Sequence, residues 1–398
     1  MFCRIHHPLS FLALTATSLG AFLVLYTSWT VAAAEINSFS KSIIFSPFNN
    51  THSVAVTPVV PRTKTPRQTV KGLYLTAYST GNPKKVDEII RLIDSTELNA
   101  VVIDIKDYTG YVLYDSQVPL VQKYKTKKVL VKNLIDVIQK FHDHNIYVVA
   151  RQTVFQDPVL AEQAPAMALK DKRGGLWRDN KGLAWVDASN EAVWKYNIAI
   201  AREAVGLGFD EINFDYVRFP SDGNMSQVKF SSSTGKKYKV MSAFYDRLSK
   251  ELANEPVWLS LDMFGFVMEK HGEDDMNIGQ RLSDALNTSD YICPMMYPSH
   301  YPPGHLGFAN PADHPGQVIE NGLRIGMAQF TSTTRAQVRP WIQAFSIGAV
   351  YDSTKIRQQI DAVDKYTDAG WLMWNASNRY TAAGLKSEVA SVATSTLP

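Results

Sequence analysis

The sequence contains very little cysteine. Only Cys3 and Cys293 occur among its 398 residues, and Cys3 lies in an apolar amino-terminal segment. The rest of the chain has no pair of cysteines for a disulfide, so a hydrophobic core must stabilise its fold. Cys293 belongs to the apolar run 291–296, which favours a buried, inert thiol over a nucleophile.

An excess of charge of one sign is also missing. The formal net charge is +3, which argues against a nucleic-acid protein that depends on counterion release. One basic cluster stands out, made up of Lys123, Lys125, Lys127, Lys128 and Lys132. We interpret it as a solvated loop and helix start, with binding of a polyanionic cell-wall polymer as the alternative.

Several catalytic and nucleotide-binding motifs are absent. The chain has neither G-x-x-x-x-G-K-[ST] nor G-x-G-x-x-G, so nucleotide binding has no support, and it lacks the G-x-S-x-G elbow of serine hydrolases. His300, His305 and His314 lie in one proline-rich loop without the spacing of metal ligands. We therefore expect neither a cofactor nor a metal.

The amino terminus lacks charge over a long stretch. Between Arg4 and Glu35 there is no Asp, Glu, Lys or Arg, and residues 11–31 are apolar enough to enter a bilayer. Three alanines at 32–34 resemble a cleavage site. Residues 1–34 are predicted to be a signal peptide, or else a membrane anchor through residues 9–31 with the bulk of the chain facing outward. Either way we expect export, with the protein secreted or held on the outer face of the cytoplasmic membrane.

The rest of the chain divides into a linker and one domain. Residues 35–69 are rich in Pro, Ser and Thr and read as a linker. From residue 70 to 398, strand patterns alternate with amphipathic helical patterns, and the strands begin near Gly72, Ala100, Ile146, Glu211, Val257, Tyr291, Arg339 and Gly370. Eight such repeats close most simply into an α/β fold, a (β/α)8 TIM barrel, with an open doubly wound sheet as the alternative.

The stretch 209–220, FDEINFDYVRFP, carries the strongest functional signal. Period-2 alternation places Asn213 and Asp215 on one face of a strand that ends in a turn, as in the active-site strands of barrels. Asp262 is expected at a similar height on the next strand. Two neighbouring carboxylates are what glycoside hydrolysis needs, one as acid and one as nucleophile or base. The alternative is a structural pair, with Asp215 bridged to Arg151 or Arg218.

Other polar and aromatic residues are expected around the same end of the barrel. Those predicted to position a sugar are Asp104, Lys106, Arg151, Asn213, Arg218, Tyr297 and Gln343. Those predicted to stack on sugar faces are Trp177, Trp185 and Trp374. For Trp177 and Trp185, which lie in the long connection 157–190, packing of that loop is the alternative.

The segment from Lys71 to about Ala382 resembles the putative glycosyl hydrolase domain family. The resemblance rests on KGLYLTAY, NAVVIDIKDYTGYVLYDS, FDEINFDYVRFPSDG, LSLDMFG and ICPMMYPSHY. It implies a TIM barrel in bacterial proteins of largely uncharacterised activity. More distantly, Asp215 looks like the nucleophile of alpha-amylase-like and alpha-galactosidase-like barrels, whereas Asp262 stands where the amylase-like enzymes have Glu.

Residues and resemblance together predict an exported glycoside hydrolase-like protein. We expect it to cleave glycosidic bonds of an envelope or extracellular polysaccharide, with Asp215 as nucleophile or base and Asp262 as acid. The partner would be a polysaccharide or oligosaccharide and not a nucleic acid. A second interpretation makes the same barrel a non-catalytic carbohydrate-binding or wall-associated module. Both need the same polar end of the barrel, so the sequence does not separate them.

Overall fold

The computed structural model describes residues 63–231 and 234–387. The predicted signal or anchor, including residues 9–31, lies outside these residues, as does the linker up to residue 62. Within the two described ranges, no helix combines the length and the apolarity that a membrane span requires. Residues 63–69 have no regular secondary structure, and the Thr65 carbonyl accepts a hydrogen bond from the Trp258 indole at 3.0 Å.

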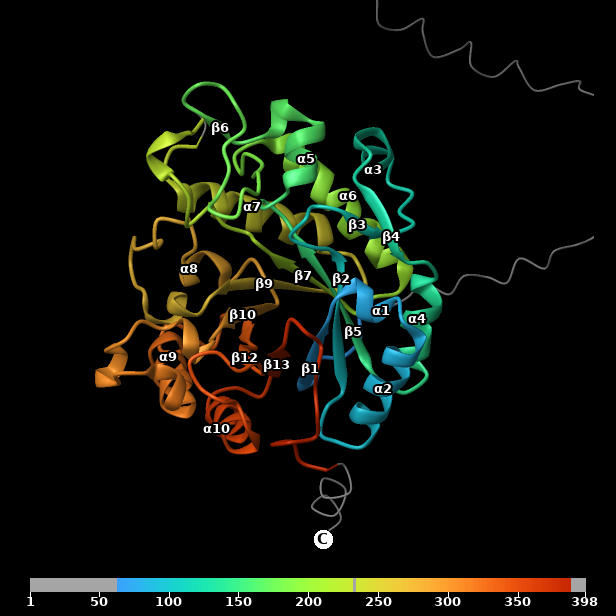
Figure 1. Ribbon diagram of the computed structural model, residues 1–398, viewed down its shortest axis with the longest axis vertical. Coiled ribbons are helices and arrows are strands. Elements are labelled where there is room, and N and C mark those ends of the chain that lie inside the picture. The colour runs from blue at the N-terminus through green and yellow to red at the C-terminus, as the bar shows by residue number, and fades with distance from the viewer. Residues whose placement is uncertain (1–62, 232–233, 388–398) are drawn as a thin grey trace, which may run out of the picture. The chain divides into compact units, whose positions relative to one another are not determined.

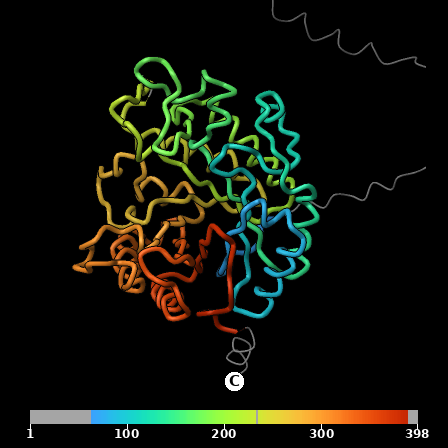
Figure 2. The backbone as a smooth tube through the Cα atoms, viewed as in Figure 1, coloured from blue at the N-terminus to red at the C-terminus, as the bar shows by residue number. Residues whose placement is uncertain are grey.

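Eight parallel strands form a closed barrel (Figure 1). They are β1 (Val70–Leu75), β2 (Ala100–Lys106), β5 (Tyr147–Thr153), β7 (Glu211–Asp215), β9 (Trp258–Phe264), β10 (Tyr291–Met295), β12 (Trp341–Gln343) and β13 (Gly370–Trp374). β1 pairs with both β2 and β13, which closes the ring. Figure 2 shows this closure as the blue start of the barrel beside its red end. The predicted (β/α)8 barrel is therefore confirmed.

Helices cover the outside of the barrel between successive strands. The long ones are α2 (Pro83–Asp94), α4 (Leu134–His142), α6 (Glu191–Leu207), α7 (Lys237–Leu252), α9 (Pro315–Met327) and α10 (Ser353–Asp364). The helix between β9 and β10 is short, α8 (Leu282–Ala285). The described residues 382–387, which follow β13, contain no helix and include a turn with Gly384 at φ 80°.

The helices form where the sequence supplies caps and an apolar stripe. In α2, Asn82 accepts a hydrogen bond from the Lys84 amide, and Pro83 occupies the first turn. Val86, Ile89, Ile90 and Ile93 are buried against the barrel, as their helical spacing predicts.

Long excursions leave the barrel after several strands. After β2 the chain forms β3 (Val112–Tyr114), a short helix α3 (Pro119–Tyr124) and β4 (Lys127–Val131). After β5 it forms α5 (Pro158–Gln163) and β6 (Lys170–Asp171), and β6 pairs with β8 (Val228–Lys229) from the β7 connection. All of these follow the carboxyl ends of strands, where barrels build their functional sites.

The interior of the barrel contains a buried ion pair near the amino ends of the strands. The Arg339 guanidinium donates two hydrogen bonds to Glu211, at 3.0 and 2.8 Å, and Tyr147 donates a third at 3.0 Å. Both charged side chains have no exposed surface. Arg339 also lies over the Tyr291 ring at 3.7 Å. Arg339 Nε also donates to the Ala369 carbonyl at 3.1 Å, whereas Nη2 has no hydrogen-bond partner in the described part of the chain. The ion pair and these hydrogen bonds offset the cost of burying both charges.

Replacing Arg339 by Met tests this pair. The variant leaves Glu211 buried without its cation, so we expect the free energy of unfolding to fall by about 3–5 kcal/mol, measured by urea denaturation. The double variant Glu211→Leu/Arg339→Met should recover most of the loss, because no charge stays buried. Lys250→Met, in the exposed pair with Asp246, should cost less than about 1 kcal/mol. Equal losses of unfolding free energy in Arg339→Met and Lys250→Met would contradict the prediction that breaking the buried pair costs more than breaking an exposed one.

Candidate active site

Four charged residues meet inside the carboxyl end of the barrel. Asp104 comes from β2, Arg151 from β5, Asp215 from β7 and Asp262 from β9, which are consecutive strands of the ring. Asn213 is level with Ser260 across the β7–β9 ladder, so Asp215 and Asp262, each two residues further on, lie at the same height. The alternation in the sequence thus places both carboxylates on the inner side of the barrel.

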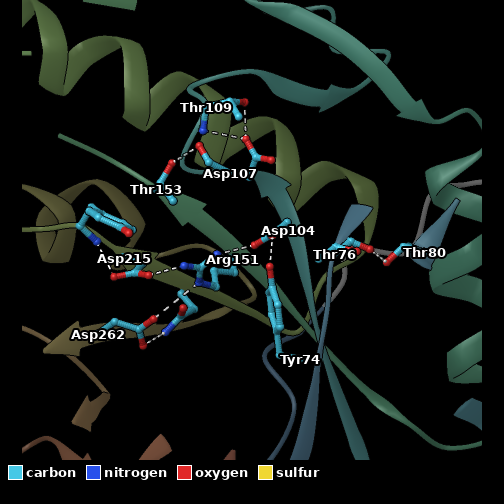
Figure 3. A network of polar contacts seen from close by, with 12 residues as sticks. Tyr74, Thr76, Thr80, Asp104, Asp107, Thr109, Arg151, Thr153, Asp215 and Asp262 are labelled. Atoms are coloured by element: carbon cyan, nitrogen blue, oxygen red, sulfur yellow. Dashed lines mark hydrogen bonds and ion pairs between the residues drawn. The ribbon is translucent and has the colours of Figure 1, made fainter. Parts of the chain in front are cut away.

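Arg151 is the centre of this group (Figure 3). Its guanidinium donates to Asp104 Oδ1 at 2.5 Å and to Asp215 Oδ2, and its Nε lies 3.8 Å from Asp262 Oδ2. The guanidinium also lies 4.9 Å from the centre of the Trp374 ring. Only 6% of the Arg151 side chain is exposed, so water screens these charges poorly. One cation therefore holds three carboxylates together.

Asp262 is the most enclosed of the three carboxylates. Its side chain has no exposed surface, and its Oδ1 accepts hydrogen bonds from Asn213 and from the Trp341 indole, both at 2.8 Å. Burial, and then the charge of Asp215, raise the pKa of Asp262 well above its usual value. This environment favours the protonated form of Asp262.

Asp104 has a second partner on the first strand. The Tyr74 hydroxyl donates to its Oδ2 at 2.5 Å, and the Tyr74 ring stacks on Trp374 with centroids 3.8 Å apart. Burial raises the pKa of Asp104 from 3.8 to about 6, although Arg151 and Tyr74 oppose the shift. Asp104 therefore titrates close to neutral pH.

Asp215 is oriented by an unusual backbone conformation. The next residue, Tyr216, has φ 52°, a left-handed value that is uncommon for a bulky residue and stores local strain. This turn allows the Tyr216 amide to donate to Asp215 Oδ1 at 2.5 Å. The other oxygen is held by Arg151, so both carboxylate oxygens are fixed.

Four buried polar atoms beside Asp215 have no hydrogen-bond partner within the described part of the chain. We call them the inner polar cluster: Asp262 Oδ2, Arg151 Nε, Asn213 Oδ1 and Tyr297 Oη. Arg151 Nε lies 3.8 Å from Asp262 Oδ2, and the Asn213 amide group donates to the other oxygen of Asp262. Burial, and then the charges of Asp262 and Asp215, raise the pKa of Tyr297. Buried polar atoms are normally satisfied, and unsatisfied ones in a native protein often mark a functional site.

Other residues predicted for the site lie around this group or away from it. Lys106 follows a register shift in β2 and points to Asp157, at 2.9 Å, and to the Thr153 carbonyl, at 2.7 Å. Arg218 lies over the rings of Trp185 and Phe264. Arg218 therefore lies between the 157–190 loop and the end of β9, and Lys106 is not part of the Arg151 group.

The remaining predicted residues are mostly buried. Trp177 and Trp185 are 3% and 2% exposed, and their indole groups donate to the Asn224 carbonyl and to Asp179. Gln343 accepts from the Ser299 amide and so supports the β10 loop. Direct contact between these three side chains and a ligand requires the loops above them to move. Trp374 is half-buried beside Tyr74.

Two residues of the site were missed in the sequence. Tyr74 and Trp341 contact Asp104 and Asp262 directly. Period-2 alternation could have placed both side chains inside the barrel. Trp341 is two residues before Gln343 on one strand, and Tyr74 is two residues after Gly72 on another. Exposed aromatic rings were missed as well: Tyr78 and Tyr108, which follow β1 and β2, are 64% and 53% exposed.

Among the described residues, no group of three or more His, Cys, Asp or Glu side chains is arranged to hold a metal ion. The three histidines of the proline-rich loop have separate neighbours. His305 lies 3.4 Å from Glu269, His314 stacks on Phe308, and His300 contacts Tyr297.

The raised pKa of Asp104 predicts a pH dependence of stability. Because the folded state binds this proton more tightly than the unfolded state, stability should fall as pH rises from about 4 to about 6. For the wild type we expect the free energy of unfolding to fall by about 2 kcal/mol over this range. In Asp104→Asn the side chain cannot titrate, so this fall should be absent. Urea midpoints between pH 4 and 7 measure the difference. Asp246→Asn, at an exposed site, should keep the wild-type slope of unfolding free energy against pH. Identical slopes for all three proteins would contradict a raised pKa of Asp104.

The fold is shared with solved glycoside hydrolase domains. The PgaB (BpsB) glycoside hydrolase domain from Bordetella bronchiseptica is 11% identical and superposes with a TM-score of 0.55 over 79% of this chain and 95% of that one. The C-terminal domain of a putative chitinase from Desulfitobacterium hafniense DCB-2 is 11% identical, with a TM-score of 0.50 over 77% and 93% of the two chains.

A nearer relative in sequence is a hypothetical protein from Ruminiclostridium thermocellum ATCC 27405. It is 40% identical over 48% of this chain and 96% of that one, with a TM-score of 0.45. No curated protein matches the sequence significantly. The model of the putative glycosyl hydrolase domain family matches residues 72–380, which include all eight barrel strands except the first two residues of β1. The chain therefore belongs to the putative glycosyl hydrolase domain family.

Proposed function

We propose that this protein is an exported glycoside hydrolase that cleaves an envelope or extracellular polysaccharide. Asp215 would attack the sugar or activate water, and Asp262 would protonate the leaving oxygen. The observation that carries the proposal is the inner polar cluster, whose buried unpartnered atoms lie beside Asp215. Hydroxyl groups of a sugar offer the donors and acceptors that these atoms lack.

The surroundings of the two carboxylates suit different roles. Asp215 is ion-paired with Arg151 and held by the Tyr216 amide, which fixes the direction of its lone pairs. The raised pKa of Asp262 favours its protonated form, as the role of acid requires. A protonated acid and a fixed carboxylate on adjacent strands are the two groups that the reaction needs.

Access is the main physical requirement of this mechanism. The side chain of Asp215 is 7% exposed and that of Asp262 is fully covered. A sugar must therefore displace part of the cover over these carboxylates. Arg218, which follows β7 and packs on Trp185 and Phe264, is the group that we propose moves. In this proposal Asp104, Asn213, Arg218 and Tyr297 position the sugar, while Lys106, Trp177, Trp185 and Gln343 hold the surrounding loops.

The burial of Asp262 also favours a second candidate, a non-catalytic carbohydrate-binding barrel. In this case the Arg151 group would be a structural network, because one guanidinium engages Asp104 and Asp215 and lies near Asp262. Ligand binding would then use the exposed rings at the carboxyl end of the barrel rather than the carboxylates.

Hydrolysis of a polysaccharide panel, followed by reducing-end detection, separates the two candidates. If the pair is catalytic, Asp215→Asn and Asp262→Asn should each lower the rate by at least about 100-fold. Asp246→Asn, an exposed control, should not change it, and thermal unfolding checks that each variant is folded. Polysaccharide binding without release of reducing ends by the wild type would favour the non-catalytic barrel.

The aromatic residues give a further prediction. Tyr108→Ala and Trp374→Ala should raise KM by about fivefold through lost stacking, with kcat changed less. Tyr366→Ala serves as the control, because Tyr366 lies between the end of α10 and the amino end of β13. If Trp185→Phe raises KM while Tyr108→Ala does not, the stacking surface is the 157–190 loop, as the sequence predicts.

Export is proposed from residues 1–34, as a cleaved signal or as an anchor through residues 9–31. The uncharged run and the three alanines support it. Recovery of the intact, uncleaved chain from the soluble cytosol would contradict both forms.

A further inference from the structure

A surface rich in lysine lies beside the carboxyl end of the barrel, outside the Arg151 group. Between Asp115 and Asp136 the chain carries five lysines and no Asp or Glu. This segment forms α3 and β4 in the excursion between β2 and α4 (Figure 1). Lys123, Lys125, Lys128 and Lys132 are exposed.

A groove of about 450 Å³ runs along this surface. One wall comes from the start of α2, with Gly81, Pro83 and Val86, and the other from β4 and α4, with Leu130, Lys132 and Val137. The walls meet closely, since a side chain at Gly81 would come within 2.4 Å of the Leu130 carbonyl oxygen. The two walls are therefore in direct contact at this point of the groove.

The lysines around the groove are only partly neutralised. Lys85, Lys127 and Lys140 have carboxylate partners, in Glu88, Asp115 and Asp87. Within the described residues no ion pair is formed by Lys84, Lys123, Lys125, Lys128 or Lys132. Asp136 is the acidic side chain that lines the groove itself. The surface thus keeps an excess of positive charge although the whole chain is nearly neutral.

Apolar groups accompany these charges. Tyr78 is 64% exposed, and its hydroxyl lies 3.5 Å from Lys128 Nζ. Val129 and Ile135 are 39% and 58% exposed. A surface that combines cations with an exposed ring and aliphatic groups matches a polymer with carboxylates along its length and apolar sugar faces between them.

We propose that this surface, the lysine groove, binds an acidic polysaccharide rich in hexuronate. Carboxylates of the polymer pair with Lys84, Lys128 and Lys132, and a sugar ring rests on Tyr78. The concave shape fits a single chain better than a flat bilayer. The site is reached from the same barrel end as Asp215, because α1 (Ala77–Thr80) directly follows β1 and its Tyr74. The inference deepens the proposed function by naming its substrate class, but binding here does not require turnover.

Binding of fluorescently labelled oligogalacturonate, measured by anisotropy on the full chain, tests the site. The variant Lys84→Ala/Lys128→Ala/Lys132→Ala should bind about tenfold more weakly at low salt. A second triple variant, Lys181→Ala/Lys195→Ala/Lys229→Ala, removes the same charge from exposed positions elsewhere and should bind within about twofold of the wild type. Tyr78→Ala should weaken binding and retain the salt dependence, because it removes no charge.

Three results would overturn the proposal: no binding of oligogalacturonate by the wild type, equal weakening in both triple variants, or equal affinity for neutral dextran. If the first triple variant loses binding to anionic lipid vesicles but still binds oligogalacturonate like the wild type, the surface would be assigned to a membrane instead. Binding that depends on the three lysines, together with absent hydrolysis by the wild type, would reject the proposed catalysis while keeping the lysine groove.

Discussion

The buried guanidinium of Arg151 is the interaction on which the functional end of the barrel depends. Three carboxylates point into a space that water hardly reaches, and without a cation their mutual repulsion would have to be relieved by protonation or by opening of the barrel. Arg151 contacts Asp104 and Asp215 and lies near Asp262. The geometry of the candidate site is therefore inseparable from the stability of this barrel end.

The barrel has a second arginine, and the contrast between the two is informative. Arg339, near the amino ends of the strands, faces a single carboxylate, Glu211, supported by Tyr147. Charge there is balanced one to one, as in a structural pair. Around Arg151 the carboxylates outnumber the cation. Burial raises the pKa of both Asp104 and Asp262, and the charge of Asp215 raises the pKa of Asp262 further. An unbalanced charge set at the carboxyl end is the expected sign of a functional site.

Period-2 alternation made most of this site predictable from the sequence. It placed Asp104, Arg151, Asp215 and Asp262 inside the barrel because strands in a closed barrel have only two faces. It failed at Lys106, where a register shift in β2 turns the side chain toward Asp157. The surroundings of Trp177 and Trp185 could not be predicted, because loop burial depends on contacts that no local pattern encodes.

Burial raises the pKa of Asp262 and also separates its carboxyl group from any substrate, so one physical cause has two opposite consequences. A sugar that approached Asp262 would bring hydroxyl groups to the unpartnered atoms of Arg151, Asn213 and Tyr297. The new hydrogen bonds would offset the free-energy cost of displacing the groups that bury the carboxylates. It would also keep water away from the acid, so the raised pKa would persist while the substrate is bound. The covered state of the site is thus compatible with catalysis only if the sugar itself replaces the cover. For this reason the groups that cover Asp215 and Asp262 matter as much as the two carboxylates themselves.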